Sequence, residues 1–303
     1  MGHNIAESGH GAGPAPPGHR EGRVTATDTP HYTPDWLQLR EGADAAARAP
    51  ELVDSLRAHL AARPGPDGPL VVHDLGCGTG SMGRWLAPRL PAPQRWVLHD
   101  RDPRLLQRAV EQPPCDAQGT PVAVGTRRGD LGRLTADDLA GASLVTASAL
   151  LDVLTREEVD RLAALCAEAG CPVLLALSVV GRVELTPADP LDDEILDAFN
   201  AHQRRGELLG PDAVTVATAA FERQGAVVRT QCSPWRLGPE ESALTAEWLR
   251  GWVGAAKEQR PDLGARAEAY LRRRLAVCEA GGVGAVVHHR DLLALPAAVE
   301  AAA

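Results

Sequence analysis

The stretch VVHDLGCGTGSMG, residues 71–83, constrains the fold of this chain more than any other feature. It places a cluster of glycines directly after a short apolar run. Glycine tolerates positive φ and lets a ligand approach the backbone closely, and a helix that follows offers free N–H groups. Such a strand, loop and helix are typical of the ligand-binding edge of an open parallel sheet.

The segments that follow this loop repeat the same order of strand and helix. One of these helices is expected in DPRLLQRAV, residues 102–110, with Asp102 as its cap. Seven strands are expected, at residues 69–75, 95–100, 121–128, 142–148, 171–180, 226–235 and 284–295. Most are continuous apolar runs, as expected when helices cover both faces of a parallel sheet. We therefore predict an α/β fold with a doubly wound, mostly parallel, seven-stranded sheet.

Four regions are expected along the chain. Residues 1–28 are rich in Gly, Pro and His and have no apolar stretch, which predicts a disordered tail without a signal peptide. Residues 29–66 have a helical pattern and form an N-terminal helical cap. Residues 67–296 form the main domain, which includes a helical insertion at 239–280 before the last strand.

The amino-acid composition of the chain limits the kinds of molecule that it is expected to bind. Acidic residues outnumber basic ones 40 to 31, a net charge of −9, which disfavours a nucleic acid substrate. The six cysteines contain no C-x-x-C pair, which indicates a reduced, cytoplasmic protein. No run approaches the roughly 18 to 20 apolar residues of a membrane span. We expect a monomer or a homodimer and no metal site.

Two glycine signatures overlap in the loop. Counted from Gly78, GTGSMG matches the G-x-G-x-x-G of dinucleotide-binding proteins; counted from Gly76, the loop is G-x-G-x-G preceded by an acid. Asp74 beside the loop would repel a pyrophosphate, whereas it suits a cofactor that carries an ammonium and a sulfonium. Asp100 follows Gly80 by 20 positions, where both classes place an acid that binds ribose hydroxyls.

Several motifs, taken in order, resemble one family. HDLGCGTG, LHDRDP, RRGDL and VTASALLDVL are similar to the successive motifs of the class I S-adenosylmethionine-dependent methyltransferases, over about residues 50–290. Further stretches, HYTPDWLQLREGADAAARA, FNAHQRR and SPWRLGP, resemble a bacterial subgroup without an assigned substrate. The resemblance implies a Rossmann-like fold, S-adenosyl-L-methionine as cofactor and S-adenosyl-L-homocysteine as product.

The resemblance also implies which residues bind the methionine part of that cofactor. The loop residues Gly76, Cys77, Gly78 and Gly80 would lie under it, and Asp74 would hold its amino group. The backbone around Ser148 would face the same end.

The nucleoside part has its own expected residues. By the resemblance, Asp100 would bind the two ribose hydroxyls, and Arg101 with its neighbours would flank the adenine. Asp130 would accept a hydrogen bond from the adenine amino group, and Leu131 would pack on the ring.

The methyl acceptor is less defined. Asp152 is a candidate general base, or a cap of the helix that begins near Thr155. His31 and Tyr32 precede the first helix and are candidate catalytic residues in a lid, or a surface anchor. The candidate substrate-binding residues, each with a structural alternative such as core packing or an exposed helical face, are Trp36, His202 and Trp235.

The expected function is therefore cytoplasmic methyl transfer to an O, N or C atom of a small molecule. SALLD stands where amino-methylating enzymes have an N-P-P-Y type motif, which disfavours a base amine or glutamine amide as acceptor. Three alternatives stay open: an rRNA or tRNA methyltransferase using the arginines at 127–128 and 272–274, a nicotinamide-dependent oxidoreductase, and a non-catalytic cofactor-binding relative.

Overall fold

A computed structural model describes residues 33–62 and 68–297. The expected tail at 1–28, His31 and Tyr32 lie outside the described residues. The chain forms one eight-stranded sheet in the order β3-β2-β1-β4-β5-β8-β6, with β7 paired to β8. The strands are β1 (Leu70–Leu75), β2 (Gln94–Asp100), β3 (Ala123–Arg128), β4 (Leu144–Ser148), β5 (Val173–Thr186), β6 (Val227–Cys232), β7 (Trp235–Leu237) and β8 (Gly284–Leu295).

Strands β1 to β5 run parallel to one another, and β8 is antiparallel to β5, β6 and β7. The strand order reverses next to β1, so the glycine loop lies at the switch point of the sheet. The predicted doubly wound, mostly parallel fold is confirmed.

The number of strands differs from the seven expected. The predicted strand at 226–235 is two strands, because the chain leaves the β6 ladder at Ser233 and Pro234 before β7 begins. Proline has no backbone N–H to donate to a ladder. Ser233 still donates its amide to the His289 carbonyl on β8 at 2.9 Å, and its hydroxyl donates to Asp291 on the same strand.

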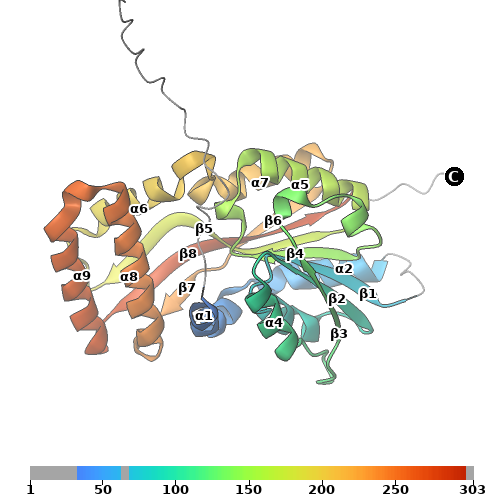
Figure 1. The fold of residues 1–303 in the computed structure, drawn as a ribbon, viewed down its shortest axis with the longest axis horizontal. Helices are drawn as coiled ribbons and strands as arrows, with labels where there is room; N and C mark the ends of the chain where they lie inside the picture. Colours follow the sequence, from blue (N-terminus) through green and yellow to red (C-terminus); the bar gives the residue numbers. More distant parts are fainter. Residues whose placement is uncertain (1–32, 63–67, 298–303) are drawn as a thin grey trace, which may run out of the picture. The chain divides into compact units, whose positions relative to one another are not determined.

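Helices cover both faces of the sheet (Figure 1). One hydrophobic core joins the sheet to α5 and α7, and a second joins the opposite face to α2, α3 and α4. The helices are α1 (Pro34–Ala47), α2 (Pro50–Ala62), α3 (Ser81–Leu86), α4 (Pro103–Glu111), α5 (Arg156–Ala169), α6 (Asp192–Gln203), α7 (Ala213–Arg223), α8 (Ser242–Gln259) and α9 (Gly264–Glu279).

The long strands β5 and β8 continue beyond the parallel strands, where β7 joins them. Helices α6, α8 and α9 lie beside this extension, on the left in Figure 1, and share a third core with it. Trp252 and Tyr270 are fully buried there. Helices α8 and α9 correspond to the predicted insertion at 239–280.

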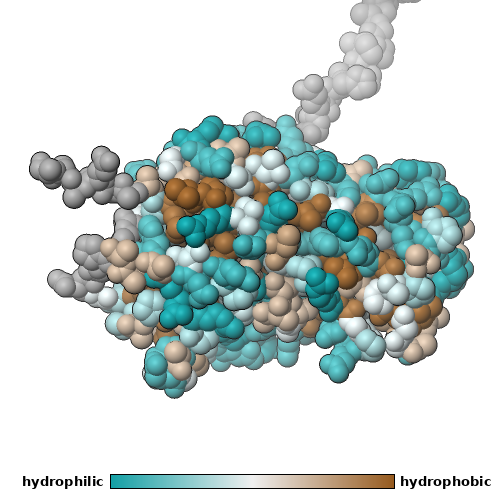
Figure 2. All heavy atoms as spheres, turned by 180° about the vertical axis from the view of Figure 1, so that it is seen from behind, coloured by the Kyte–Doolittle hydropathy of each residue, from teal (hydrophilic) through white to brown (hydrophobic). Residues whose placement is uncertain are grey.

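The surface carries few large apolar side chains. Figure 2 shows one face, on which hydrophilic residues predominate. Among the described residues, the exposed large hydrophobic side chains are Leu39, Val110 and Val227. Within the same ranges, none of the helices has the length and apolar character to span a membrane.

Candidate cofactor and acceptor site

The glycine loop connects β1 to α3 at the carboxyl edge of the sheet. Gly76, Gly78 and Gly80 have φ values of +61°, +55° and +85°, which L side chains rarely adopt. Between them, the Cys77 amide donates to the carbonyl of His99 at 2.9 Å. Burial raises the pKa of the Cys77 thiol well above its usual range, which disfavours the thiolate form.

Asp74 is the most unusual acid of the site. Its side chain on β1 is fully buried, and neither carboxylate oxygen has a hydrogen-bond partner among the described residues. Burial raises the pKa of Asp74 to about 7, and the charge of Asp100 adds to this shift, whereas Arg48 and Arg84 oppose it. A buried carboxyl without a partner is costly, and such groups concentrate at functional sites.

Asp100 at the end of β2 supports the loop. One of its oxygens, Oδ2, accepts from the Gly78 amide at 2.9 Å, and Oδ1 accepts from the Asp102 amide at 2.9 Å. Each carboxylate oxygen has a further lone pair that can accept from another donor. Asp102 caps α4, as the sequence predicted, and the half-buried Arg101 lies between the two acids.

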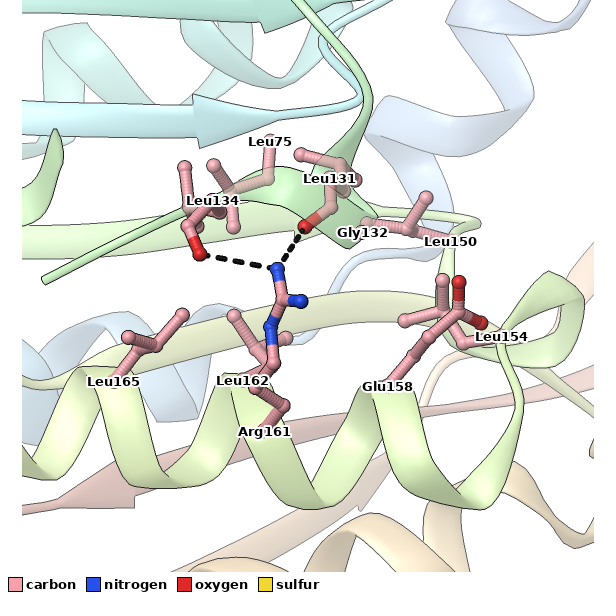
Figure 3. Close-up of a pocket in the computed structure, with 10 residues that line it drawn as sticks. All are labelled: Leu75, Leu131, Gly132, Leu134, Leu150, Leu154, Glu158, Arg161, Leu162 and Leu165. Atoms are coloured by element: carbon pink, nitrogen blue, oxygen red, sulfur yellow. Dashed lines mark hydrogen bonds between the residues drawn. The ribbon is translucent and has the colours of Figure 1, made fainter.

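The segment after β3 forms the wall of an apolar pocket (Figure 3). Asp130 is exposed and caps the 3-10 turn Leu131–Arg133 through a bond from the Gly132 amide at 2.8 Å. Arg161 on α5 donates to the carbonyls of Leu131 and Leu134 and holds this turn in place. The pocket is lined by Leu75, Leu131, Gly132, Leu134, Leu150, Leu154, Glu158, Arg161, Leu162 and Leu165.

Ser148, the last residue of β4, is tied to a residue that the sequence analysis missed. Its hydroxyl accepts from Nη2 of Arg48 at 3.1 Å, and the same nitrogen donates to Ser81 at 3.3 Å. Arg48 follows α1 and is 2% exposed. The residue after Ser148, Ala149, has a φ of +52°, a strained conformation that clusters at functional sites.

In the sequence, only the spacing of Arg48 from two other charged residues points to it. Arg40, Asp44 and Arg48 follow one another at intervals of four residues; Arg40 and Asp44 lie on one face of α1, and Arg48 is the residue at which this helix ends. The Asp44 carboxylate accepts hydrogen bonds from two nitrogens of Arg40 and from the indole N–H of Trp235. This face therefore lies against β7 and the carboxyl edge of the sheet.

Two of the predicted substrate-binding residues are aromatic partners of Arg40. Its guanidinium carbon lies 5.9 Å from the ring centroid of Trp36 and 4.8 Å from that of Trp235. Trp235 is 3% exposed, and its ring also contacts that of His289, with 5.3 Å between the centroids. Trp36 is half-buried, so it keeps a surface that a ligand could reach.

Asp152 lies in a 3-10 turn, Leu151–Val153, after β4. It does not cap the next helix, because Thr155 caps α5 in a capping box with Glu158. The Oδ1 atom of Asp152 is buried without a hydrogen-bond partner in the described part of the chain. Burial raises the pKa of Asp152, and the charge of Arg40 opposes this.

His202 lies apart from the other predicted residues. Its ring joins α6 to α8, with Nε2 at 3.0 Å from Glu258 and Nδ1 at 3.0 Å from Arg205. Burial and the charge of Arg205 lower its pKa, and Glu258 opposes them. The structure therefore places His202 within the helices over the sheet extension rather than at the strand ends.

Similar solved structures are methyltransferases or related synthases. A cyclopropane synthase, MmaA2, from Mycobacterium tuberculosis is 12% identical, with 86% of this chain and 94% of that chain covered and a TM-score of 0.45. A putative sarcosine dimethylglycine methyltransferase from Galdieria sulphuraria is 12% identical, with coverage of 86% and 97% and a TM-score of 0.46.

A third solved structure was determined with a ligand. It is an S-adenosylmethionine-dependent methyltransferase from Geobacter sulfurreducens in complex with S-adenosyl-L-homocysteine, 18% identical, with coverage of 87% and 98% and a TM-score of 0.43. No family model and no curated protein matches the sequence. All three TM-scores lie below 0.5.

Proposed function

We propose that this chain is an S-adenosyl-L-methionine-dependent methyltransferase that acts on a small molecule. The observation that carries this proposal is Asp74, a fully buried carboxyl without a partner among the described residues, beneath a loop with three positive-φ glycines. A cofactor with an amino group supplies the cation that Asp74 lacks, whereas a pyrophosphate would place like charges together.

The residues present fit the parts of that cofactor. The methionine part is held by Asp74, by the loop at residues 76–80, which includes Cys77, and by the backbone at Ser148. Asp100 accepts from the ribose hydroxyls with the lone pairs that its two backbone bonds leave. Asp130 and Arg101 flank the adenine, and the apolar pocket beside Leu131 supports its ring.

When bound, S-adenosylmethionine supplies a methyl group on a positively charged sulfur. The methyl forms a bond to a lone pair of the acceptor as its bond to sulfur breaks, and S-adenosylhomocysteine is left. The protein mainly has to align the two reactants and exclude water. The buried residues at the carboxyl ends of the strands, which α1 covers, serve that purpose.

Asp152 is the proton acceptor in this proposal. It lies after β4, its Oδ1 is free of partners within the described residues, and its raised pKa brings its titration closer to neutrality. Trp36 lines the acceptor side, and Trp235 supports it by fixing Arg40. His31 and Tyr32, outside the described residues, remain candidate catalytic residues, and His202 remains a candidate contact for a larger acceptor.

A labelled-methyl transfer screen tests the proposed function. The full chain is incubated with methyl-labelled S-adenosylmethionine and either a low-molecular-weight metabolite extract or total RNA. We expect label in a small molecule, identified by mass, and none in RNA. The Asp74→Asn variant is expected to lose the transfer, whereas Asp137→Asn, at an exposed loop acid, is expected to retain it. Label in RNA alone would contradict the proposed substrate class.

A further inference from the structure

The chain that follows α6 lies beside the turn that carries Asp152. The Leu209 amide donates to the carbonyl of Leu154 at 2.9 Å. The next residues form the 3-10 turn Gly210–Asp212, which contacts α6, β5 and the Asp152 turn. In the proposed function Asp152 accepts the proton of the methyl acceptor, so this part of the chain borders the acceptor side of the site.

The backbone of this segment has an unusual conformation. Gly206, Glu207 and Gly210 have φ values of +59°, +74° and +51°, and Glu207 is not a glycine. A Cβ at Gly210 would lie 2.9 Å from the Cβ of Gln203, so glycine allows the turn to approach the end of α6 this closely. Strained backbone of this kind is concentrated at functional sites.

Two amide side chains at the end of α6 have unpartnered oxygens. Asn200 donates Nδ2 to the carbonyl of Gly181 on β5 at 2.9 Å, and its Oδ1 is buried without a partner in the described chain. Gln203 lies three residues further on the same helix face, and its Oε1 is likewise buried without a partner among the described residues. A buried oxygen without a hydrogen bond is costly, so each of these oxygens needs a donor.

A third oxygen of this kind is Oδ1 of Asp152. All three are hydrogen-bond acceptors, and all three belong to elements that contact the same 3-10 turn. Arg204, at the end of α6, is bound to Asp212 through two nitrogens. Arg205 donates to the carbonyl of His202 at 3.0 Å. Neither arginine supplies the missing donors, which leaves that role to a ligand.

We propose that Asn200, Gln203 and Asp152 recognise the methyl acceptor, and that this acceptor is a neutral or cationic molecule with several N–H or O–H donors. This rests on the proposed function. Amide oxygens and a carboxylate accept hydrogen bonds from amines and alcohols, whereas an anionic group would meet acceptor oxygens and the charge of Asp152. Metabolites with a net negative charge are therefore poor acceptors for this chain.

Fractionation of the acceptor pool tests this inference. A low-molecular-weight metabolite extract is passed over a strong anion exchanger at pH 8, and the unbound material is divided on a cation exchanger into neutral and cationic pools. Each pool is incubated with the full chain and methyl-labelled S-adenosylmethionine. We expect label in a small molecule of the neutral or the cationic pool, which distinguishes an alcohol from an amine as acceptor.

The outcomes separate this inference from the proposed function. Label in the anionic pool, alone or together with another pool, would overturn the inference and leave the proposed function intact. Label in none of the pools would overturn the proposed function on which the inference rests.

The variant Gln203→Met removes one of the three oxygens and keeps the length of the side chain. Because Oε1 has no partner among the described residues, the ligand-free protein loses no hydrogen bond at this atom, and the urea midpoint is expected to stay or rise. The KM for the identified acceptor is expected to rise about 10-fold, with kcat and S-adenosylhomocysteine affinity retained.

The matched control is Gln224→Met, at the exposed end of α7, which is expected to keep the wild-type KM. An unchanged KM in a folded Gln203→Met protein would overturn the inference. If that variant does not fold, the distribution of label among the three pools decides.

Discussion

The backbone amide of Gly78 donates a hydrogen bond to Oδ2 of Asp100 across 2.9 Å, which links the loop after β1 to the end of β2. The two residues are 22 positions apart in the sequence and meet because β1 and β2 are adjacent parallel strands. One carboxylate therefore both shapes the glycine loop and remains available to hydroxyl donors. In the proposed function, cofactor binding and loop geometry therefore depend on the same side chain.

Replacement of Asp100 by asparagine is expected to weaken S-adenosylhomocysteine binding by about 10- to 100-fold, because a neutral amide accepts more weakly and with one oxygen only. Titration calorimetry measures the change. Asp137→Asn, a change of the same chemistry at an exposed loop, serves as the control. An Asp100→Asn protein with wild-type affinity would remove Asp100 from the site.

Replacement of Gly78 by alanine is expected to destabilise the protein by about 1 to 2 kcal/mol, because φ there is +55°. A Cβ would also lie 3.0 Å from Leu37 of α1, so ligand binding is expected to weaken as the loop shifts. Urea unfolding of the variant measures the loss. In Gly125→Ala on β3 the added Cβ meets nothing within 4 Å, so this control should lose less stability. Equal losses would contradict the conformational argument.

The strand pattern and the glycine spacing predicted the parallel part of the fold, because both depend on local sequence. The predicted capping of α4 by Asp102 is likewise local and is confirmed. The split between β6 and β7 was not predicted, although Pro234 between them has no N–H to donate to a ladder.

The site was predictable only in part, for the same reason. The acids at strand ends can be recognised from their position after apolar runs. For Arg48 the sequence offers only its spacing of four residues from Asp44, because its contacts depend on Ser148, which is 100 positions away, and on its burial. The burial of Trp235 and the helix contacts of His202 also depend on tertiary packing that spacing does not reveal.

Replacement of Asp74 by asparagine is expected to stabilise the ligand-free protein and to weaken ligand binding. The pKa of Asp74 is raised to about 7 from 3.8, so the folded state binds a proton that the unfolded state has lost. Wild-type stability therefore falls as pH rises from about 4 to 7. The gain in the free energy of unfolding from Asp74→Asn should be largest above pH 7, roughly 2 to 4 kcal/mol, and should disappear near pH 4. A gain independent of pH would show that ionisation of Asp74 is not the cause.

The buried histidines predict acid sensitivity. Burial is the main cause that lowers the pKa of His73 and of His99 to about 4 and that of His289 to about 3. The unfolded chain takes up these protons below about pH 6.5, so stability is expected to fall between pH 6.5 and 4, by up to about 1.4 kcal/mol per pH unit for each histidine.

Unfolding of the Asp74→Asn protein over this pH range isolates the histidine effect, because Asp74 acts in the opposite direction. The ring nitrogens of His73 and His99 lie 3.0 Å apart, so His99→Gln should reduce the slope. Stability that stays constant down to pH 4 would contradict the neutral state of these side chains.

Replacement of Asp152 by asparagine is expected to lower kcat for the acceptor found in the methyl transfer screen by about 100-fold or more, with S-adenosylhomocysteine affinity unchanged. The wild-type rate should rise with pH as Asp152 ionises, and this rise should be absent in the variant. Because the pKa of Asp152 is raised, the rate is expected to rise at pH values above the usual pKa range of an aspartate. A parallel loss of affinity would instead place Asp152 on the cofactor.

Titration calorimetry of the full chain with S-adenosylhomocysteine and, separately, with NADH tests the central claim most directly. The account predicts saturable binding of one S-adenosylhomocysteine per chain, weakened in the Asp100→Asn and Asp74→Asn variants, and no binding of NADH. Binding of NADH without binding of S-adenosylhomocysteine would contradict it.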